Sequence, residues 1–191
     1  MPSQYKSRFW KKNWDPWVKD LNSEEFEMSY IELVKPTFEE FSDRMALEYY
    51  GVEITFDELD KYSNQFANML SKNGFKKGDI VGINLPNVPQ YPIAALGTLK
   101  AGCIVSGVSP LLSSVQIQYQ LTDLGSSGKR IALFTLDSIY AEKIVKIAED
   151  TDQLKMVITT NVASFLPKIN DDIINTYGEI PQVDISPLKG K

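Results

Sequence analysis

The chain has 191 residues, 43% of them hydrophobic and 24% charged, which is typical of a globular protein large enough to bury a core. The absence of histidine excludes His-containing catalytic dyads and triads and His-ligated zinc, and the net charge of −5 argues against a nucleic acid partner. No apolar run is long enough to span a bilayer, and the N-terminus lacks a signal-peptide pattern, so we expect a cytoplasmic protein. The one cysteine, Cys103, excludes an internal disulfide; it lies in an apolar strand pattern, so we expect a buried, inert thiol.

Residues 1–44 are predicted to form an N-terminal arm followed by a helix. The arm could lie on an anionic membrane surface or pack on the body of the protein. We favour packing with buried tryptophans, because Asp15-Pro16 interrupts any long amphipathic helix. Apolar residues at intervals of three or four over 24–41 then predict a helix, interrupted at Pro36. The arm combines basic and aromatic residues: Lys6, Arg8, Lys11, Lys12, Trp10, Trp14 and Trp17.

A β-hairpin is predicted next, with strands over 45–50 and 53–55 and a turn at Gly51-Val52. The segment Thr55-Phe56-Asp57-Glu58 has the spacing of a capping box, in which the first and last residues satisfy each other's backbone amides. The helix that it starts ends at Gly74, which suits a left-handed cap. One face of this helix is predicted to be buried: Leu59, Ser63, Phe66 and Leu70, with Tyr62 and Met69 beside them.

The centre of the chain, residues 74–111, is predicted to be a βαβ unit. Its strands are the apolar runs 80–85 and 103–108, and its helix runs from 88 to 101 and ends at Gly102. Short connections between strand, helix and strand require two parallel, buried strands. Small residues at helical spacing would let this helix approach the sheet closely: Ala94, Gly97 and Ala101.

The same alternation continues after the central unit. A Ser-x-x-Gln capping box starts a helix over 113–125, and strands are predicted over 131–135 and 156–160, with a helix over 138–150 between them. The order β-α-β-α-β-α-β is the signature of an open α/β sheet. The predicted fold class is therefore α/β, a mostly parallel open sheet flanked by helices, with an N-terminal arm and a β-hairpin.

We divide the chain into the arm and helix at 1–44, an α/β subdomain at 45–160, and a weakly patterned tail at 161–191. The tail contains three prolines and little periodicity.

A phosphate-binding loop is the first site to look for in such a sheet. The segment Gly125 to Arg130, GSSGKR, resembles one, but Asp123 and Arg130 stand where a Walker loop needs Gly and Ser or Thr. It also leads from a helix into a strand, which is the wrong direction. We interpret it as an αβ connection.

Loops that follow strands are the usual places for ligands. Pro86-Asn87 and Ser109-Pro110 could present amides or side chains to a ligand, or could only turn the chain and cap the next helix; we favour the turn. The acidic pairs Glu24-Glu25, Glu39-Glu40 and Asp171-Asp172 are interpreted as solvated faces rather than metal sites. The residues alone thus indicate an α/β sheet domain with no catalytic constellation.

Six segments nevertheless follow one another in a distinctive order: ITFDEL (54–59), GFKKGDIV (74–81), LPN (85–87), LGTLKAG (96–102), SPL (109–111) and YQLTD (119–123). They resemble motifs in the N-terminal part of the AMP-forming adenylating enzymes, which include acyl-CoA synthetases, luciferases and peptide-synthetase adenylation domains. The last two are most similar to those of fatty acid–CoA ligases. The match runs from about Met45 to Leu136.

This resemblance implies a two-step reaction. A carboxylate attacks the α-phosphate of Mg·ATP to give an acyl-adenylate and diphosphate, and the thiol of coenzyme A then displaces AMP. ATP, Mg²⁺ and coenzyme A would serve the full-length enzyme, with a small carboxylic acid, a fatty acid by resemblance, as substrate. In the family the nucleotide is held by a Ser/Thr/Gly-rich loop with a lysine, a Tyr-Gly-x-Thr-Glu segment, a ribose-binding aspartate and a lysine of a mobile C-terminal domain. No segment of the sequence matches any of these family elements.

We therefore expect an N-terminal fragment of an AMP-forming carboxylate–CoA ligase that is inactive by itself and binds none of these cofactors tightly. The matched motifs are caps, turns and buried strands, so no catalytic, cofactor-binding or metal-ligating residue is assigned. Two alternatives stay open. One is a dimerisation or docking module, acting through the arm as a homodimer or by peripheral membrane contact. The other is a small nucleotide-binding domain, against which the missing phosphate loop weighs.

Overall fold

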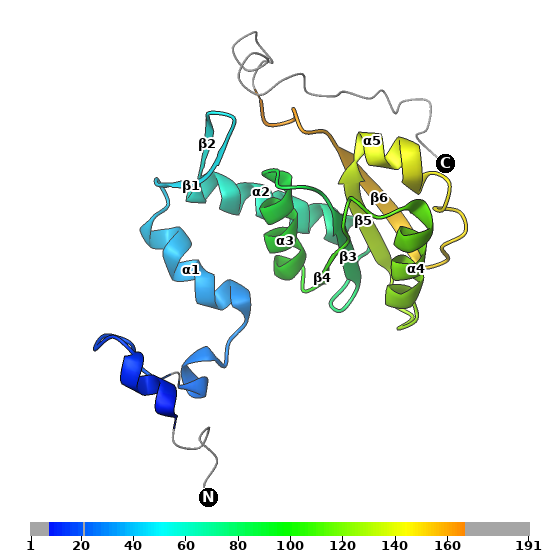
Figure 1. Cartoon of the computed structure of the whole chain (residues 1–191). Helices are drawn as coiled ribbons and strands as arrows, with labels where there is room; N and C mark the ends of the chain where they lie inside the picture. The colour runs from blue at the N-terminus through cyan, green and yellow to red at the C-terminus, as the bar shows by residue number, and fades with distance from the viewer. Residues whose placement is uncertain (1–7, 21, 167–191) are drawn as a thin grey trace, which may run out of the picture.

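A computed structural model of the chain describes residues 8–20 and 22–166. Its centre is a four-stranded parallel sheet in the order β4-β3-β5-β6, and a separate antiparallel hairpin precedes it (Figure 1). The predicted α/β fold with an open parallel sheet, flanking helices and a hairpin is confirmed. The strands are β1 (Met45–Tyr49), β2 (Val52–Thr55), β3 (Ile80–Asn84), β4 (Ile104–Gly107), β5 (Ile131–Leu136) and β6 (Leu154–Thr160).

Helices cover both faces of the sheet because its central strands are apolar on both sides. Val81 and Phe134 face the layer made by α2 and α3, whereas Ile131 and Leu133 face α4 and the segment after β5. This division follows from the two-residue period of a strand. The helices of the two layers are α2 (Phe56–Lys72) and α3 (Gln90–Lys100) on one face, and α4 (Ser114–Gly125) and α5 (Asp137–Ile139) on the other.

The predicted caps are confirmed. The Glu58 amide donates to the Thr55 hydroxyl and the Thr55 amide donates to the Glu58 carboxylate at 2.9 Å, which starts α2. Ser113 and Gln116 start α4 in the same way. The face of α2 that was predicted to be buried is buried: Leu59, Ser63, Phe66 and Leu70.

The hairpin turn lies one residue earlier than predicted. The turn residues are Tyr50 and Gly51, with φ values of 50° and 77°, so the prediction of Gly51-Val52 was wrong. A two-residue turn of type I′ needs positive φ at both central positions, and its twist matches that of the flanking strands. The non-glycine residue in this turn is Tyr50, whose ring packs edge-on against Tyr49 at 4.6 Å between centroids.

The first long helix also differs from its prediction. α1 (Tyr30–Glu40) begins only after a capping box between Ser29 and Glu32, and it runs through Pro36 without interruption. Proline removes one backbone hydrogen bond, to the carbonyl four residues back, and the remaining bonds of this exposed helix hold it together. The earlier part of the predicted helix is a short 3₁₀ turn, η2 (Ser23–Phe26).

The helix predicted over 138–150 is irregular. After the single turn of α5, the chain widens into a π turn, η3 (Tyr140–Ile144), in which the Val145 amide donates to the carbonyl of Tyr140, five residues back. Tyr140, Ile144 and Ile147 are all buried against the sheet.

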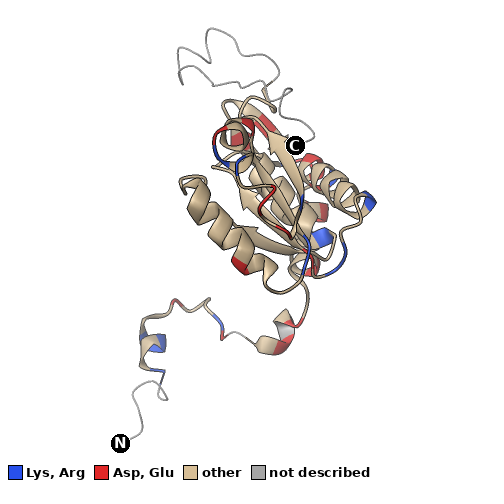
Figure 2. Cartoon of the chain, turned by 90° about the vertical axis from the view of Figure 1, so that its right-hand side faces the viewer, with Lys and Arg blue, Asp and Glu red and all other residues tan. Residues whose placement is uncertain are grey.

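The N-terminal arm leads away from the body of the protein (Figures 1 and 2). It contains the 3₁₀ turn η1 (Phe9–Asn13), and Arg8 and Lys11 both pair with Asp20. The prediction that the arm packs on the body and buries its tryptophans was wrong, since Trp14 is 38% and Trp17 is 77% exposed. The ion pairs of the arm are internal to it, so they do not draw it onto the body.

No helix among residues 8–20 and 22–166 is long and apolar enough to cross a membrane. The division of the chain at residues 44 and 160 stays a prediction. The pair Asp171-Asp172 and most of the predicted tail lie outside the described residues.

The sequence predicts that the small residue Gly97 lets its helix approach the sheet. In the structure Gly97 instead allows α3 to approach α2. A methyl group at Gly97 would lie 2.6 Å from the backbone oxygen of Ser63 and 2.8 Å from Cβ of Phe66. Both atoms belong to α2, whose backbone cannot move aside cheaply. The close crossing of these two helices therefore depends on glycine at this position.

Replacing Gly97 with alanine should lower the free energy of unfolding by about 1–3 kcal/mol, because the added methyl group forces the two helices apart. Urea denaturation followed by circular dichroism would measure the loss. Gly107→Ala is the matched control, since its added methyl group would be 3.7 Å from the nearest neighbouring atom, the hydroxyl of Tyr91. Equal stabilities of the two variants would contradict this account of the helix crossing.

Cys103 is buried, as predicted, with 4% of its surface exposed and its sulfur 3.4 Å from the carbonyl of Lys76. Burial raises the pKa of this thiol, and the nearby carboxylate of Asp79 adds to the shift.

We therefore expect iodoacetamide to leave the native protein unmodified at pH 8 and to modify it fully in urea. Because the folded pKa is raised, the associated stability is present below the ordinary thiol pKa of about 8.5 and declines as the pH rises above it. Rapid alkylation of the native protein would contradict the buried state.

Candidate functional site

The carboxyl ends of β3 and β5, the usual ligand-binding edge of such a sheet, are tied together by one amide. Asn84, the last residue of β3, is fully buried. Its Oδ1 accepts a hydrogen bond from the Thr135 hydroxyl at 2.7 Å, and its Nδ2 donates to the carbonyl of Val108 at 3.1 Å. This arrangement links three neighbouring strand ends, so it positions backbone and leaves little of the amide for a ligand.

A second buried amide, that of Gln90, joins α3 to the end of β6. Its Nε2 donates to the Thr160 hydroxyl at 3.1 Å and to the carbonyl of Asn161 at 2.9 Å. Within the described part of the chain, its Oε1 has no hydrogen-bond partner, although Gln90 is only 5% exposed. The Tyr49 hydroxyl donates to the carbonyl of Val162 nearby and brings the hairpin onto the same segment.

The two loops considered as ligand sites have separate surroundings. Asn87 is exposed and lines a hollow of about 230 Å³ against the hairpin and the start of α3. Ser109 accepts a hydrogen bond from the Leu111 amide, and the Lys143 ammonium donates to the carbonyls of Pro110 and Leu112 at 3.2 and 3.0 Å. The second loop is thus held by η3, which lies in the same helix layer as α4, as expected of a chain-turning segment.

The Gly125 to Arg130 segment connects α4 to β5, in the direction that the sequence predicts. The Arg130 guanidinium donates to the carbonyls of Gly74 and Asn73 and lies over the Phe75 ring at 4.7 Å from its centroid. Its cation therefore supports the turn before β3.

ATP and Mg²⁺ do not fit the groups that the described residues bring together. Neither residues 8–20 nor 22–166 contain a cluster of three or more His, Cys, Asp or Glu side chains that could hold a metal ion. Asn84 and Thr135, buried at the carboxyl edge, are engaged in joining strands, and the glycine-rich segment lies at the other edge, before β5.

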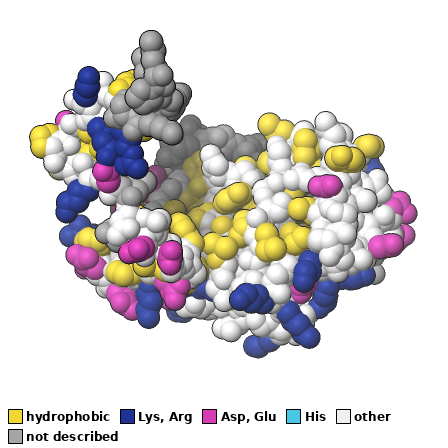
Figure 3. Space-filling model, turned by 90° about the horizontal axis from the view of Figure 1, so that it is seen from below, with side chains coloured by type: hydrophobic (Ala, Val, Ile, Leu, Met, Phe, Trp, Pro, Cys, Tyr) yellow, Lys and Arg dark blue, Asp and Glu magenta, His cyan; other side chains and the backbone are white. Residues whose placement is uncertain are grey.

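A larger recess lies beneath α1, where this helix crosses α2 and α3. Seen from below, hydrophobic side chains gather where the surface is hollowed between the N-terminal part and the body (Figure 3). The recess has a volume of about 450 Å³, within the roughly 300–1,000 Å³ typical of ligand pockets. We call it the α1 hollow, and it is lined by Ile31, Val34, Lys35, Phe38, Glu39, Ser42, Asp57, Asp60, Asn64, Leu96 and Lys100.

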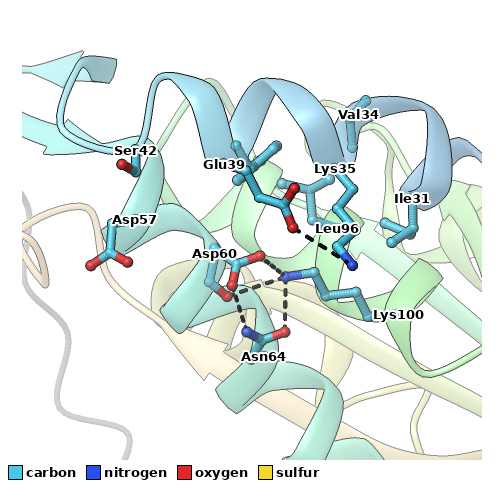
Figure 4. Close-up of a pocket in the computed structure, with 11 residues that line it drawn as sticks. Ile31, Val34, Lys35, Glu39, Ser42, Asp57, Asp60, Asn64, Leu96 and Lys100 are labelled. Carbon is cyan, nitrogen blue, oxygen red and sulfur yellow. Dashed lines mark hydrogen bonds and ion pairs between the residues drawn. The ribbon is translucent and has the colours of Figure 1, made fainter.

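One lysine closes the floor of the α1 hollow (Figure 4). The Lys100 ammonium, with 14% of the side chain exposed, donates to Asp60 Oδ1 at 2.6 Å, to Ser63 Oγ at 2.7 Å and to Asn64 Oδ1 at 2.9 Å. Three short bonds to α2 satisfy all three of its protons, so it fastens the end of α3 and is not free to act as a nucleophile or base. Sequence reasoning missed this cluster, because the four residues come from two helices that are 36 or more positions apart at their contact.

The rim of the α1 hollow is acidic. Glu39 pairs with Lys35 at 3.6 Å, and Asp60 pairs with Lys100. Among the described residues, the Asp57 carboxylate makes no ion pair or side-chain hydrogen bond, and it lies at one end of the hollow beside Ser42 (Figure 4). Apolar walls and a carboxylate suit an apolar group that carries a cation, and they disfavour an anionic nucleotide.

Comparison with known proteins agrees with the resemblance predicted from the motifs. The curated relatives include the long-chain-fatty-acid–CoA ligase of Salmonella typhimurium, 32% identical over 157 residues, which are 82% of this chain and 27% of that protein. The Bacillus subtilis long-chain-fatty-acid–CoA ligase is 35% identical over 128 residues, 66% of this chain and 22% of that protein. The chain thus spans about a quarter of the length of these relatives.

Solved structures show the same fold at lower identity. The crystal structure of the anthranilate CoA ligase AuaEII in complex with anthranoyl-AMP matches with a TM-score of 0.66 and 21% identity, over 82% of this chain and 29% of that one. A long-chain-fatty-acid-CoA ligase from Archaeoglobus fulgidus matches with a TM-score of 0.60 and 17% identity, over 85% of this chain and 33% of that one. The family model for AMP-binding enzymes matches residues 34–187, and the chain therefore belongs to the AMP-binding enzyme family.

Proposed function

We propose that the chain is the N-terminal α/β part of an AMP-forming carboxylate–CoA ligase that acts on fatty acids. The complete enzyme would convert acid, ATP and coenzyme A into acyl-CoA, AMP and diphosphate. The observation that carries the proposal is the 30–35% identity to long-chain-fatty-acid–CoA ligases over two thirds or more of the chain. A single free cysteine is compatible with the reducing cytoplasm that we propose as its compartment.

The role we assign to this part is that of a scaffold. Asn84 joins the carboxyl ends of neighbouring strands, and Gln90 joins α3 to the segment after β6. A sheet edge held in this way would keep the backbone at the ligand-binding side in fixed positions when the rest of the ligase supplies the nucleotide contacts. No catalytic residue is assigned, and the chain alone is proposed to be inactive.

An exposed apolar patch supports the view that this part is completed by further structure. β4 is an edge strand, and around it and on α4 several large apolar side chains face solvent. Such a patch on a small domain usually marks an interface, and an uncovered strand edge invites pairing. The patch consists of Ile104, 51% exposed, Leu111, 91%, Val115, 73%, and Tyr119, 75%.

The activity proposal is tested by diphosphate release from ATP and Mg²⁺ with a panel of fatty acids. We expect no turnover by the 191-residue chain, because the family's phosphate-binding segments do not occur in the sequence and residues 8–20 and 22–166 form no acidic cluster that could hold Mg²⁺. A chimera in which this chain replaces the matched segment of the Salmonella typhimurium ligase should form acyl-CoA. Turnover by the chain alone would overturn the assignment of inactivity, and a folded but inactive chimera would count against the ligase assignment.

The N-terminal arm favours a second role, because its aromatic side chains are uncovered. Phe9 is 50% exposed and Trp17 is 77% exposed, next to the basic residues shown in Figure 2. We propose that the arm is an association element that joins two copies of the chain into a homodimer. Tryptophans beside lysines also suit an anionic lipid surface, so membrane contact is the competing proposal.

Deleting residues 1–20 should convert a dimer into a monomer, because the deletion removes all three tryptophans and all five basic residues of the arm. Light scattering coupled to size-exclusion chromatography measures the mass of both forms. An unchanged mass would refute the role of the arm in dimerisation. Co-sedimentation of the intact chain with anionic but not neutral vesicles, lost on the same deletion, would favour membrane contact instead.

A further inference from the structure

The loop between β4 and α4, residues 108–113, lies beside the part of the sheet where a ligand is expected. In the strand order β4-β3-β5-β6, the strand that follows β3 lies on one side of it and the next strand lies on the other. Open parallel sheets bind ligands outside the carboxyl ends of the strands at such a reversal, which here falls between β3 and β5. The 108–113 loop leaves the carboxyl end of β4, the neighbour of β3, so it borders this position.

Hydrogen bonds from side chains hold both the start and the middle of this loop. At its start, the Asn84 amide of β3 donates to the carbonyl of Val108 at 3.1 Å. In its middle, the Lys143 ammonium donates to the carbonyls of Pro110 and Leu112 at 3.2 and 3.0 Å. Lys143 belongs to the π turn η3, so it joins the segments that follow β4 and β5, the two strands beside β3. Single π turns occur frequently at functional sites.

Lys143 is half-buried without a carboxylate to pair with. Within residues 8–20 and 22–166 it takes part in no ion pair, and the buried carboxylate at the end of β5, Asp137, accepts from the Ser138 amide instead. Lysine is rarely buried without a partner, so the two loop carbonyls are what holds its charge in place. Two of its three protons are engaged in this way, and the cation adds positive potential at the edge where anionic substrates would approach.

The tip of the 108–113 loop faces solvent although its backbone is fixed. Leu111 lies between the two carbonyls that Lys143 holds, and its side chain is 91% exposed. Its amide donates to the Ser109 hydroxyl at 3.3 Å, which closes a tight turn at the tip. A loop whose backbone is fixed before a ligand arrives loses little conformational entropy on binding. Such a loop is suited to be part of a binding surface.

We propose that Lys143 is a positioning residue for substrate binding, a role that rests on the proposed ligase function. By holding two loop carbonyls, it keeps the 108–113 loop in place as one wall of the substrate crevice. The loop supplies surface and no reacting group, since the hydroxyls of Ser109 and Ser113 already serve its turn and the cap of α4. A wall of this kind binds the substrate and the transition state equally, so disturbing it should raise KM and leave kcat unchanged.

Hydrogen exchange in the 191-residue chain tests whether Lys143 holds the loop. Lys143→Met removes the ammonium and keeps a long unbranched side chain. The amides of Leu111 and Leu112 should then exchange about tenfold faster or more, and those of α2 should not change, because the lost hydrogen bonds are local. Lys143→Arg should keep both rates within about threefold of the original, since a guanidinium can donate to two carbonyls. NMR spectroscopy measures the exchange of each amide.

Enzyme kinetics test whether the fixed loop serves substrate binding. In the chimera with the Salmonella typhimurium ligase, Lys143→Met should raise the KM of at least one of acid, ATP and coenzyme A about fivefold or more, with kcat within about twofold. Lys143→Arg should return that KM to within about twofold, because it restores the donors. A substitution that only destabilised the fold would reduce the amount of active enzyme and therefore kcat, so the split between KM and kcat distinguishes positioning from a structural role.

Lys146→Met is the matched control, since it makes the same change at an exposed lysine further along the same segment. Within the described part of the chain, Lys146 makes no hydrogen bond to the loop, whose two carbonyls accept from Lys143. The control should leave the exchange rates and all three KM values unchanged. Urea denaturation of each variant checks that the fold is retained.

The outcomes separate this role from the proposed function. Unchanged exchange of the loop amides in Lys143→Met would overturn the role of Lys143. If the parent chimera is active and Lys143→Met leaves every KM unchanged, or lowers kcat alone, the positioning role is overturned and the ligase function stands. A folded but inactive parent chimera counts against the ligase function and with it against the substrate crevice, while the exchange rates still decide whether Lys143 holds the loop.

Discussion

Strand β3 is buried on both faces along all five of its residues, and the rest of the chain is arranged to meet this requirement. A strand without an exposed face needs a neighbour on each edge and a helix layer above and below it. β4 and β5 supply the edges, and the two helix layers supply the cover. Side chains at the two ends of the strand hold this arrangement in register. At the amino end the Asp79 carboxylate accepts from the backbone amides of Lys76 and Arg130, and at the carboxyl end Asn84 joins its neighbours.

Much of this arrangement could be predicted because it depends on local signals. Capping boxes, helix-ending glycines and apolar runs are each encoded within a few residues, and their order alone implies parallel strands. The errors occur where tertiary contacts decide. The turn at Tyr50-Gly51 follows the twist of its hairpin, the π turn at Tyr140 is buried against the sheet, and Gly97 meets another helix. None of these contacts is visible in the spacing of residues along the chain.

The candidate site was less predictable for the same reason. The floor of the α1 hollow joins Lys100 of α3 to Asp60 and Asn64 of α2, and the sequence presents these residues as ordinary surface positions of two amphipathic helices. The hollow itself results from what α1 fails to bury, which no single segment reveals. The prediction about the arm was wrong for a similar reason, because contacts between distant segments decide where the arm lies. Its aromatic residues indicate burial somewhere, but the sequence cannot distinguish burial against its own body from burial against another surface.

This distinction bears on how a ligase of this family could use its N-terminal region. The exposed patch around β4 and α4 and the recess beneath α1 lie on different elements, and they differ in charge: the first is apolar and the second has an acidic rim. Two surfaces with different chemistry are suited to two different occupants, because a purely apolar partner would offer the carboxylate of Asp57 no counter-charge. The remainder of a ligase could cover the apolar patch while the α1 hollow stays available. Association through the arm would then add contacts without competing with the structure that completes the enzyme.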